Sequence, residues 1–360
     1  MDEGTKNRPR ITLVAVIIAV IAGIYSLDVS LERVESSELH SEARRLFENG
    51  TRLLAAGHAA EAVDPLERAY ALERDDRQYQ LAYAQALLAA GRTQDSADLL
   101  NAIVRQSPND GQANLLLARM ARARGDFDNE AAYYHRAIFG VWDRDPARIP
   151  STLANDARLE WIRDLAQRGD TRLLLGELLQ LEAETQDFDT LKQVAHYFLL
   201  AGSQARAAEL YQTLLNTHPN DAALEEGLGQ AETADGQYTD AQRAYSRALK
   251  LKPDDGAIRH DMQLTTTLSQ IDPTPRRLPS REKYDRSLAI LRMVHDTVLS
   301  CGFQGPDLTE AERILALKKS DTSNEAAEQV LQLSETLWRE RPAVCPAPEV
   351  IPMLMQKLTQ

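Results

Sequence analysis

The residues of this chain best suited to covalent chemistry are two cysteines, Cys301 and Cys345, both close to the C-terminus. Two cysteines 44 residues apart cannot form a four-ligand zinc site by themselves, but they could form a disulfide in an oxidising compartment. Closing a loop of that length would stabilise the fold by roughly 3–4 kcal/mol on the chain-entropy model. The alternative is a pair of buried free thiols.

Residue types that support acid–base or metal chemistry are present, but their spacing matches no known site. No two of the histidines have metal-ligand spacing: His40, His58, His135, His196, His218, His260 and His295. The sequence has no phosphate-binding G-x-x-x-x-G-K loop, dinucleotide-binding glycine motif, H-E-x-x-H, C-x-x-C or G-x-S-x-G. We expect the many aspartates and glutamates to lie on solvated helix faces. The chain is therefore predicted to be neither an enzyme nor a holder of a metal or cofactor.

The composition indicates an acidic protein with enough apolar residues to form a core. Hydrophobic residues make up 43% of the 360 residues, charged residues 26%, and the formal net charge is −13. Such a charge repels nucleic-acid phosphate, and no basic run offsets it. We therefore expect no nucleic-acid partner.

An uncharged apolar stretch over residues 11–27 predicts a transmembrane helix, because about 17–25 such residues are needed to span a bilayer. Three basic residues precede the stretch and two acidic residues follow it: Lys6, Arg8, Arg10, Asp28 and Glu32. The positive-inside rule then places residues 1–10 in the cytoplasm and the bulk of the chain in the periplasm, anchored in the inner membrane. The alternative is a cleaved signal peptide and a secreted protein.

A turn rich in alanine and glycine recurs between pairs of amphipathic stretches. Its glycines recur about every 34 residues with one longer gap: Gly57, Gly91, Gly125, Gly169, Gly202 and Gly236. Glycine can adopt the positive φ at which a helix ends, and Pro-Asn-Asp or Pro-Asp-Asp turns then separate successive pairs. Asn and Asp in these turns can cap the next helix. The pattern predicts stacked helical hairpins.

Residues 222–255 carry the fullest version of this pattern, with hydrophobic, small, aromatic, alanine and proline positions at Leu228, Gly229, Gly236, Tyr238, Ala241, Tyr245, Ala248 and Pro253. The pattern resembles the tetratricopeptide repeat (TPR). The resemblance covers about residues 43–255 and implies an all-α, right-handed α-solenoid of about six hairpins. The units are 43–76, 77–110, 111–144, 155–188, 188–221 and 222–255. The 155–188 unit is the weakest, because Leu174 replaces a small residue.

The segments around the repeats complete the predicted organisation. Residues 28–42 form a juxtamembrane segment, and an insertion around 145–154 is expected to form a loop or to kink the array. Residues 256–271 predict a capping helix that covers the last repeat, and 272–280 a proline-rich linker. Residues 281–360 predict a small helical domain, with helices over 282–300, 309–318, 324–339 and 348–358.

The TPR resemblance also implies which side chains would face a ligand, because the first helix of each hairpin lines the concave side. The implied groove is rich in glutamine and basic in its middle: Gln78, Leu81, Gln85, Gln112, Arg119, Arg122, Arg163, Lys192, His196, Glu226 and Gln230. Glutamine can bond to a peptide backbone and arginine to carboxylates, so the expected partner is an extended segment that is acidic or ends in a carboxylate. The alternative is that these side chains only solvate the groove. Lys192 stands where some TPR proteins bind a terminal carboxylate, but His196 replaces their asparagine, so no such clamp is predicted.

Together these features predict a membrane-tethered protein–protein interaction scaffold or adaptor, acting in envelope complex assembly or chaperoning. One alternative is an accessory subunit of an enzyme or of a cytochrome-maturation system. Another is an enzyme with its site in residues 281–360. A third is a self-assembling structural protein.

Overall fold

The computed structural model describes residues 37–142, 150–317, 322–342 and 345–359. In this part of the chain every regular element is a helix, apart from an isolated bridge between Asp110 and Val141. The predicted all-α class is therefore confirmed. The predicted transmembrane helix over 11–27 lies outside the described residues. Within them, no helix combines the length and the apolar character that crossing a bilayer requires.

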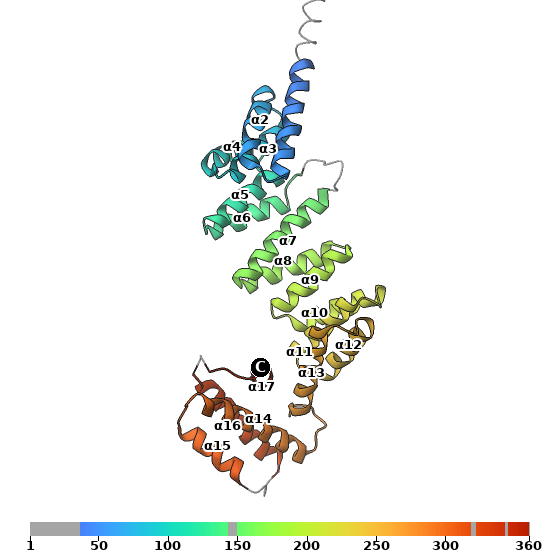
Figure 1. Ribbon diagram of the computed structural model, residues 1–360, viewed down its shortest axis with the longest axis vertical. Coiled ribbons are helices and arrows are strands. Elements are labelled where there is room, and N and C mark those ends of the chain that lie inside the picture. Colours follow the sequence, from blue (N-terminus) through green and yellow to red (C-terminus); the bar gives the residue numbers. More distant parts are fainter. Residues whose placement is uncertain (1–36, 143–149, 318–321, 343–344, 360) are drawn as a thin grey trace, which may run out of the picture. The chain divides into compact units, whose positions relative to one another are not determined.

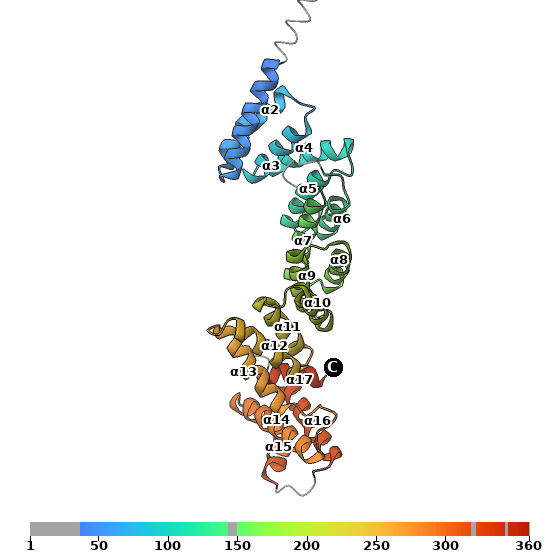
Figure 2. The same cartoon turned by 90° about the vertical axis from the view of Figure 1, so that its right-hand side faces the viewer.

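The chain divides into two compact units, residues 1–161 and 162–360. The right-handed stacking of all six hairpins therefore stays a prediction. The helices of the first unit are residues 37–55, α2 (Ala59–Leu72), α3 (Arg77–Ala89), α4 (Thr93–Gln106), α5 (Gly111–Ala123), α6 (Phe127–Ile138) and the start of α7 (Pro150–Arg168). Successive pairs form antiparallel hairpins (Figures 1 and 2).

Each hairpin turns at one of the repeated glycines. At Gly91 the backbone has φ 81°, and the Arg92 amide donates to the Leu87 carbonyl over 2.8 Å, which closes the C-terminus of α3. The same positive φ occurs at Gly57, Gly125, Gly169, Gly202 and Gly236. The prediction that these glycines form the bends of helical hairpins is confirmed.

Aspartates start most of the first helices. Asp76 accepts hydrogen bonds from the amides of Gln78 and Tyr79, and Asp110 accepts one from Ala113. Asp187, Asp221 and Asp255 do the same for the helices that begin at residues 188, 222 and 256. These carboxylates satisfy amides that have no partner inside the helix, which confirms the predicted caps.

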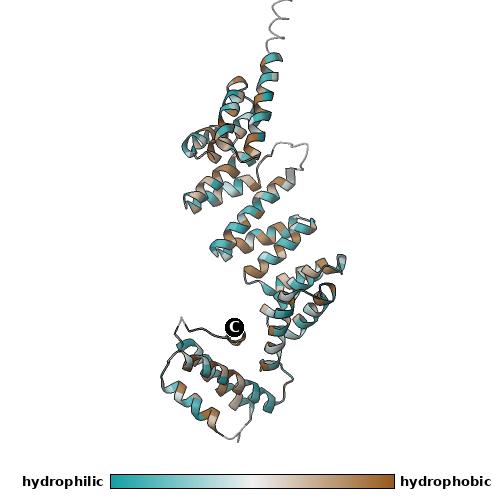
Figure 3. Ribbon diagram, in the orientation of Figure 1, coloured by the Kyte–Doolittle hydropathy of each residue, from teal (hydrophilic) through white to brown (hydrophobic). Residues whose placement is uncertain are grey.

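The second unit holds the bends of three further hairpins, at Gly169, Gly202 and Gly236, followed by a capping helix and a C-terminal helical domain. Its helices are the end of α7, α8 (Thr171–Glu184), α9 (Phe188–Leu200), α10 (Gln204–Thr217), α11 (Ala222–Ala234), α12 (Tyr238–Leu251), α13 (Gly256–Ile271), α14 (Ser280–Ser300), α15 (Pro306–Ala316), α16 (Asn324–Glu340) and α17 (Val350–Leu358). Helix α13 packs on α12, and α14 packs mainly on α16. Almost every helix carries both hydrophobic and hydrophilic residues (Figure 3).

A disulfide ties the C-terminal domain together. Cys301 follows α14 and Cys345 precedes α17, and their Cα atoms lie 5.8 Å apart. Cys345 is buried. The bond therefore fixes the segment that leads into α17 to the end of α14.

Residues 37–42 of the expected juxtamembrane segment are helical. Two sequence-based expectations need correction. The expected loop over 145–154 is helical from Pro150 onward, since proline at the first turn of a helix loses no hydrogen bond. Acidic side chains do not all lie on solvated faces: Glu130, Glu225 and Asp272 are buried.

Candidate functional site

The first unit contains a hollow of about 670 Å³ that gathers five of the predicted groove residues. We call it the N-terminal hollow. Its lining is Phe47, Thr51, Gln78, Leu81, Ala82, Gln85, Gln112, Leu115, Leu116, Arg119, Trp142, Leu153 and Asp156. Helices α3 and α5 supply most of these side chains, as the repeat pattern requires.

Three glutamines give this hollow its polar character. The side-chain amides of Gln78, Gln85 and Gln112 make no hydrogen bond to any described residue. Each amide offers both a donor and an acceptor, which is the pair that an extended peptide backbone presents. Leu81 and Leu116, which are buried, supply apolar wall between them. The arrangement suits an extended chain that carries apolar side chains.

Arg119, the expected source of positive charge, is already paired. Its Nε and Nη2 atoms donate to both carboxylate oxygens of Glu160, at 2.9 Å and 2.7 Å, and Tyr134 donates its hydroxyl to the same carboxylate at 3.0 Å. Burial raises the pKa of Glu160, but the hydrogen bonds and charge of Arg119 outweigh it and lower the pKa overall. Arg119 therefore adds no uncompensated positive charge to the hollow.

Trp142 closes the hollow beside the N-terminus of α5. Its indole Nε1 donates to the Ala137 carbonyl over 2.9 Å, which fixes the ring. A Cβ added at Gly111 would lie 2.5 Å from the Trp142 ring, so only glycine fits there. Our sequence reasoning missed Trp142, although a tryptophan just before the insertion around 145–154 was a usable signal.

A second hollow, the central hollow, lies in the second unit between α9, α10 and α11. It has about 560 Å³ and includes Lys192, His196, Glu226 and Gln230. The Lys192 ammonium pairs with Asp221 at 3.2 Å. Burial raises the pKa of Asp221, but the Lys192 hydrogen bond and the capped amides lower it overall. The lysine is therefore compensated, much as Arg119 is.

Two predicted groove residues line neither hollow: Arg122 and Arg163. Both are exposed. The expected basic middle of the groove is therefore absent from the two hollows. Sequence reasoning missed Phe47, Leu153 and Asp156. Their helices begin at residues 37 and 150, before the repeat boundaries at 43 and 155 that were assigned from the glycines.

Two stretches of the chain match family models. Residues 50–148 match the model described as the cytochrome c-type biogenesis protein H TPR domain, and residues 195–258 match a tetratricopeptide repeat model. Both describe TPR repeats, so the TPR repeat family predicted from the glycine pattern is supported. The first match contains helices α3 to α6, which carry most of the N-terminal hollow.

No curated protein sequence matches the chain. Solved structures with a similar fold include the C-terminal part of a TPR repeat-containing protein from Cytophaga hutchinsonii. It is 12% identical, with a TM-score of 0.43, and the likeness covers 79% of this chain and 99% of that one. A tetratricopeptide repeat protein from Parabacteroides merdae is 12% identical, with a TM-score of 0.39 and coverage of 82% and 99%.

Proposed function

We propose that this protein is a protein–protein interaction scaffold whose N-terminal hollow binds an extended segment of a partner protein. The observation that carries the proposal is the set of unbonded amides at Gln78, Gln85 and Gln112 beside the buried Leu81 and Leu116. Such a surface can bond a peptide backbone while it buries the segment's apolar side chains. No catalytic step is assigned to the chain.

The proposal relies on hydrogen bonding and apolar contact rather than on charge. An acidic segment would have to compete with Glu160 for Arg119 and with Asp221 for Lys192. Breaking either pair leaves a partly buried carboxylate without its cation, which costs free energy. We therefore expect that acidity of the partner contributes little to affinity at these two hollows.

Site-specific photo-crosslinking tests this proposal. A photoreactive side chain at Gln85 in the full-length protein should form adducts with partner proteins in cells. The matched control is Gln106, an exposed residue at the end of α4 that lines neither hollow. Equal adducts at both positions, or none at Gln85, would remove the N-terminal hollow as the binding site.

The proposal includes tethering to a membrane through residues 11–27, with the repeats on the periplasmic side. The uncharged stretch and the basic residues before it support this orientation. The disulfide between Cys301 and Cys345 also supports it, because disulfides persist in oxidising compartments. Labelling of intact cells with a membrane-impermeant reagent should reach residues of the repeats, and protection of the repeats until lysis would contradict the topology.

The match of residues 50–148 favours one pathway for this scaffold, cytochrome c maturation. In that role the extended partner would be the haem-free polypeptide of a c-type cytochrome. The full-length protein should then bind the haem-free form more tightly than the folded, haem-loaded form. Replacing Gln78, Gln85 and Gln112 together by alanine should weaken this binding, and Gln106→Ala should not. Equal affinity for both forms would exclude the role.

A further inference from the structure

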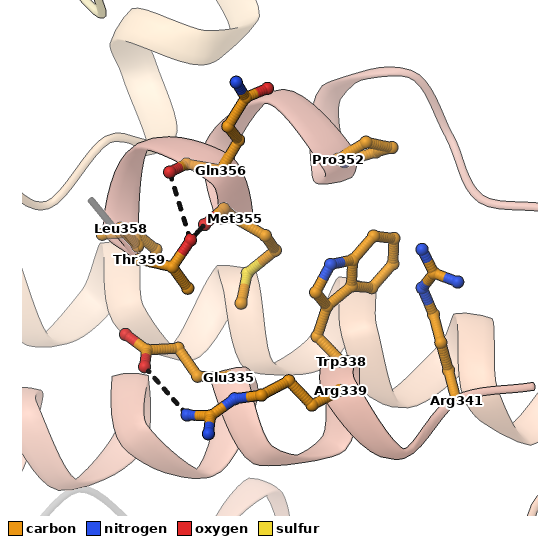
Figure 4. Close-up of a pocket in the computed structure, with 9 residues that line it drawn as sticks. All are labelled: Glu335, Trp338, Arg339, Arg341, Pro352, Met355, Gln356, Leu358 and Thr359. Carbon is orange, nitrogen blue, oxygen red and sulfur yellow. Dashed lines mark hydrogen bonds and ion pairs between the residues drawn. The ribbon is translucent and has the colours of Figure 1, made fainter. Parts of the chain in front are cut away.

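The C-terminal domain contains a third hollow, which lies between α16 and α17 and outside the repeats. It has about 700 Å³, within the range of ordinary ligand sites (roughly 300–1,000 Å³). In Figure 4, Met355 and Thr359 point from α17 toward α16, Trp338 rises from the last turn of α16, and Arg341 directly follows that helix. Pro352 of α17 lies near Trp338 and Arg341. We call it the α16–α17 hollow.

Arg341 is the unusual residue of this hollow. Its guanidinium lies over the Trp338 ring, 3.7 Å from the ring centroid. Its Nε atom is buried and makes no hydrogen bond, and no described carboxylate pairs with the side chain. A stacked guanidinium keeps its N–H edge free, because the ring occupies only its face. Arg341 as a whole is half-buried, so the outer part of its N–H edge can reach a ligand, and no described carboxylate occupies that edge.

The surrounding charges leave this arginine uncompensated. Arg339 and Glu335 pair with each other at 3.5 Å on α16 (Figure 4). The lining therefore contains two cations and one anion, in a chain whose formal net charge is −13. Such a site favours an anionic group.

We propose that the α16–α17 hollow binds a segment of a partner protein in which a carboxylate side chain stands next to an apolar one. The carboxylate accepts hydrogen bonds from Arg341, whose planar fork matches two carboxylate oxygens. The apolar side chain contacts the wall formed by Trp338, Pro352 and Met355, which are all drawn in Figure 4. This site is separate from the hollows of the repeats, so it can fail or hold independently of the function proposed above.

The three tryptophans allow a direct test in the full-length protein. Trp142 lines the N-terminal hollow, Trp338 lines the α16–α17 hollow, and Trp161 is buried. With isotope-labelled tryptophan, each indole N–H gives one nuclear magnetic resonance signal. The probe is a blocked pentapeptide, Ser-Leu-Glu-Phe-Ser, and its matched control has Gln in place of Glu. We expect the Glu peptide to shift the Trp338 signal and to leave the Trp161 signal in place.

A double-mutant cycle then assigns the contact to Arg341. Arg341→Gln should weaken binding of the Glu peptide on the order of ten- to a hundredfold and leave the Gln peptide unchanged. Arg341→Lys keeps the charge but loses the planar fork, so it should weaken binding of the Glu peptide less than Arg341→Gln does. If Arg341→Gln does not fold, Arg341→Lys serves as the test of whether Arg341 contacts the carboxylate. Arg313→Gln is the matched control, because Arg313 is an exposed arginine of α15 that pairs with Glu310.

Four outcomes would overturn the proposal. The first is no shift of the Trp338 signal, and the second is a shift of Trp142 alone, which would place the peptide in the repeats. The third is equal affinity of the Glu and Gln peptides, or an equal loss with Arg313→Gln. The fourth is binding of N-acetylglutamate amide as tight as that of the peptide, which would indicate a site for small carboxylates.

Discussion

Replacing Gly229 by alanine tests how closely the two helices of the best-formed repeat approach each other. A Cβ at this position of α11 would lie 2.8 Å from Cε1 and 2.9 Å from Cδ1 of Tyr245 on α12. The Tyr245 ring is only 2% exposed, so it cannot swing into solvent. Overpacking of this kind costs about 1–3 kcal/mol. Alanine gains about 1 kcal/mol over glycine inside a helix, so we expect a net loss of up to about 2 kcal/mol.

Gly176→Ala is the matched control in the same unit. Gly176 lies inside α8, is exposed, and has no heavy atom within 4 Å of an added Cβ. Only the helix-propensity gain applies there, so this variant should be more stable than the parent by about 0.5–1 kcal/mol. The difference between the two variants then isolates the contact with Tyr245.

Urea denaturation followed by far-ultraviolet circular dichroism measures both free energies of unfolding. Both substitutions lie in residues 162–360, so they should affect the same transition. We expect opposite signs for the two variants, with unchanged slopes against urea concentration. If Gly229→Ala proved as stabilising as Gly176→Ala, the close approach of α11 and α12 would be refuted.

Three further predictions concern the second unit. Burial raises the pKa of Glu232 from 4.5 to about 7 despite nearby arginines. The protonated side chain therefore contributes its full stabilisation below about pH 4.5, and this stabilisation is lost as the pH rises through about 7. Glu232→Gln should raise Tm at about pH 8 and leave it unchanged at about pH 4. Cys345→Ser opens a loop with a sequence separation of 44 residues and should cost up to about 4 kcal/mol, and a thiol reductant should lower the Tm of the parent but not of the variant. Lys357→Met removes the cation 2.8 Å from the buried Asp272 carboxylate and should cost about 1–3 kcal/mol in urea denaturation, whereas an unchanged midpoint would show that the ion pair contributes nothing.

Features set by a few neighbouring residues were predictable from the sequence. The positive φ at Gly91 and the cap at Asp110 follow from what glycine and aspartate can do within one turn. The capping helix predicted over 256–271 coincides with α13, since its apolar residues recur with helical period and a linker with three prolines follows it.

Features that depend on contacts between distant residues were not predictable in the same way. Arg119 stands at an inward position, but its partner Glu160 lies beyond the insertion around 145–154, and nothing local pairs them. Trp142 and Leu153 also line the N-terminal hollow. Both lie at the insertion around 145–154, where the repeat pattern predicts no inward-facing residue. The repeat pattern therefore predicts which helix faces the hollow, while the charge and the walls of the hollow depend on tertiary packing.

The acidity of this chain serves folding as well as solubility. Aspartates such as Asp76 and Asp255 stand at helix N-termini, where a carboxylate accepts hydrogen bonds from free amides and is favoured by the helix dipole. Asp221 caps α11 and also pairs with Lys192. The carboxylate that starts this repeat therefore compensates the positive charge of Lys192 in the central hollow. The charge of a groove in this chain therefore cannot be inferred from its inward cations alone, since the acidic residues that build the repeats compensate them. Among the described residues, Arg341 has no such acidic partner, and it lies in the domain that contains no repeats.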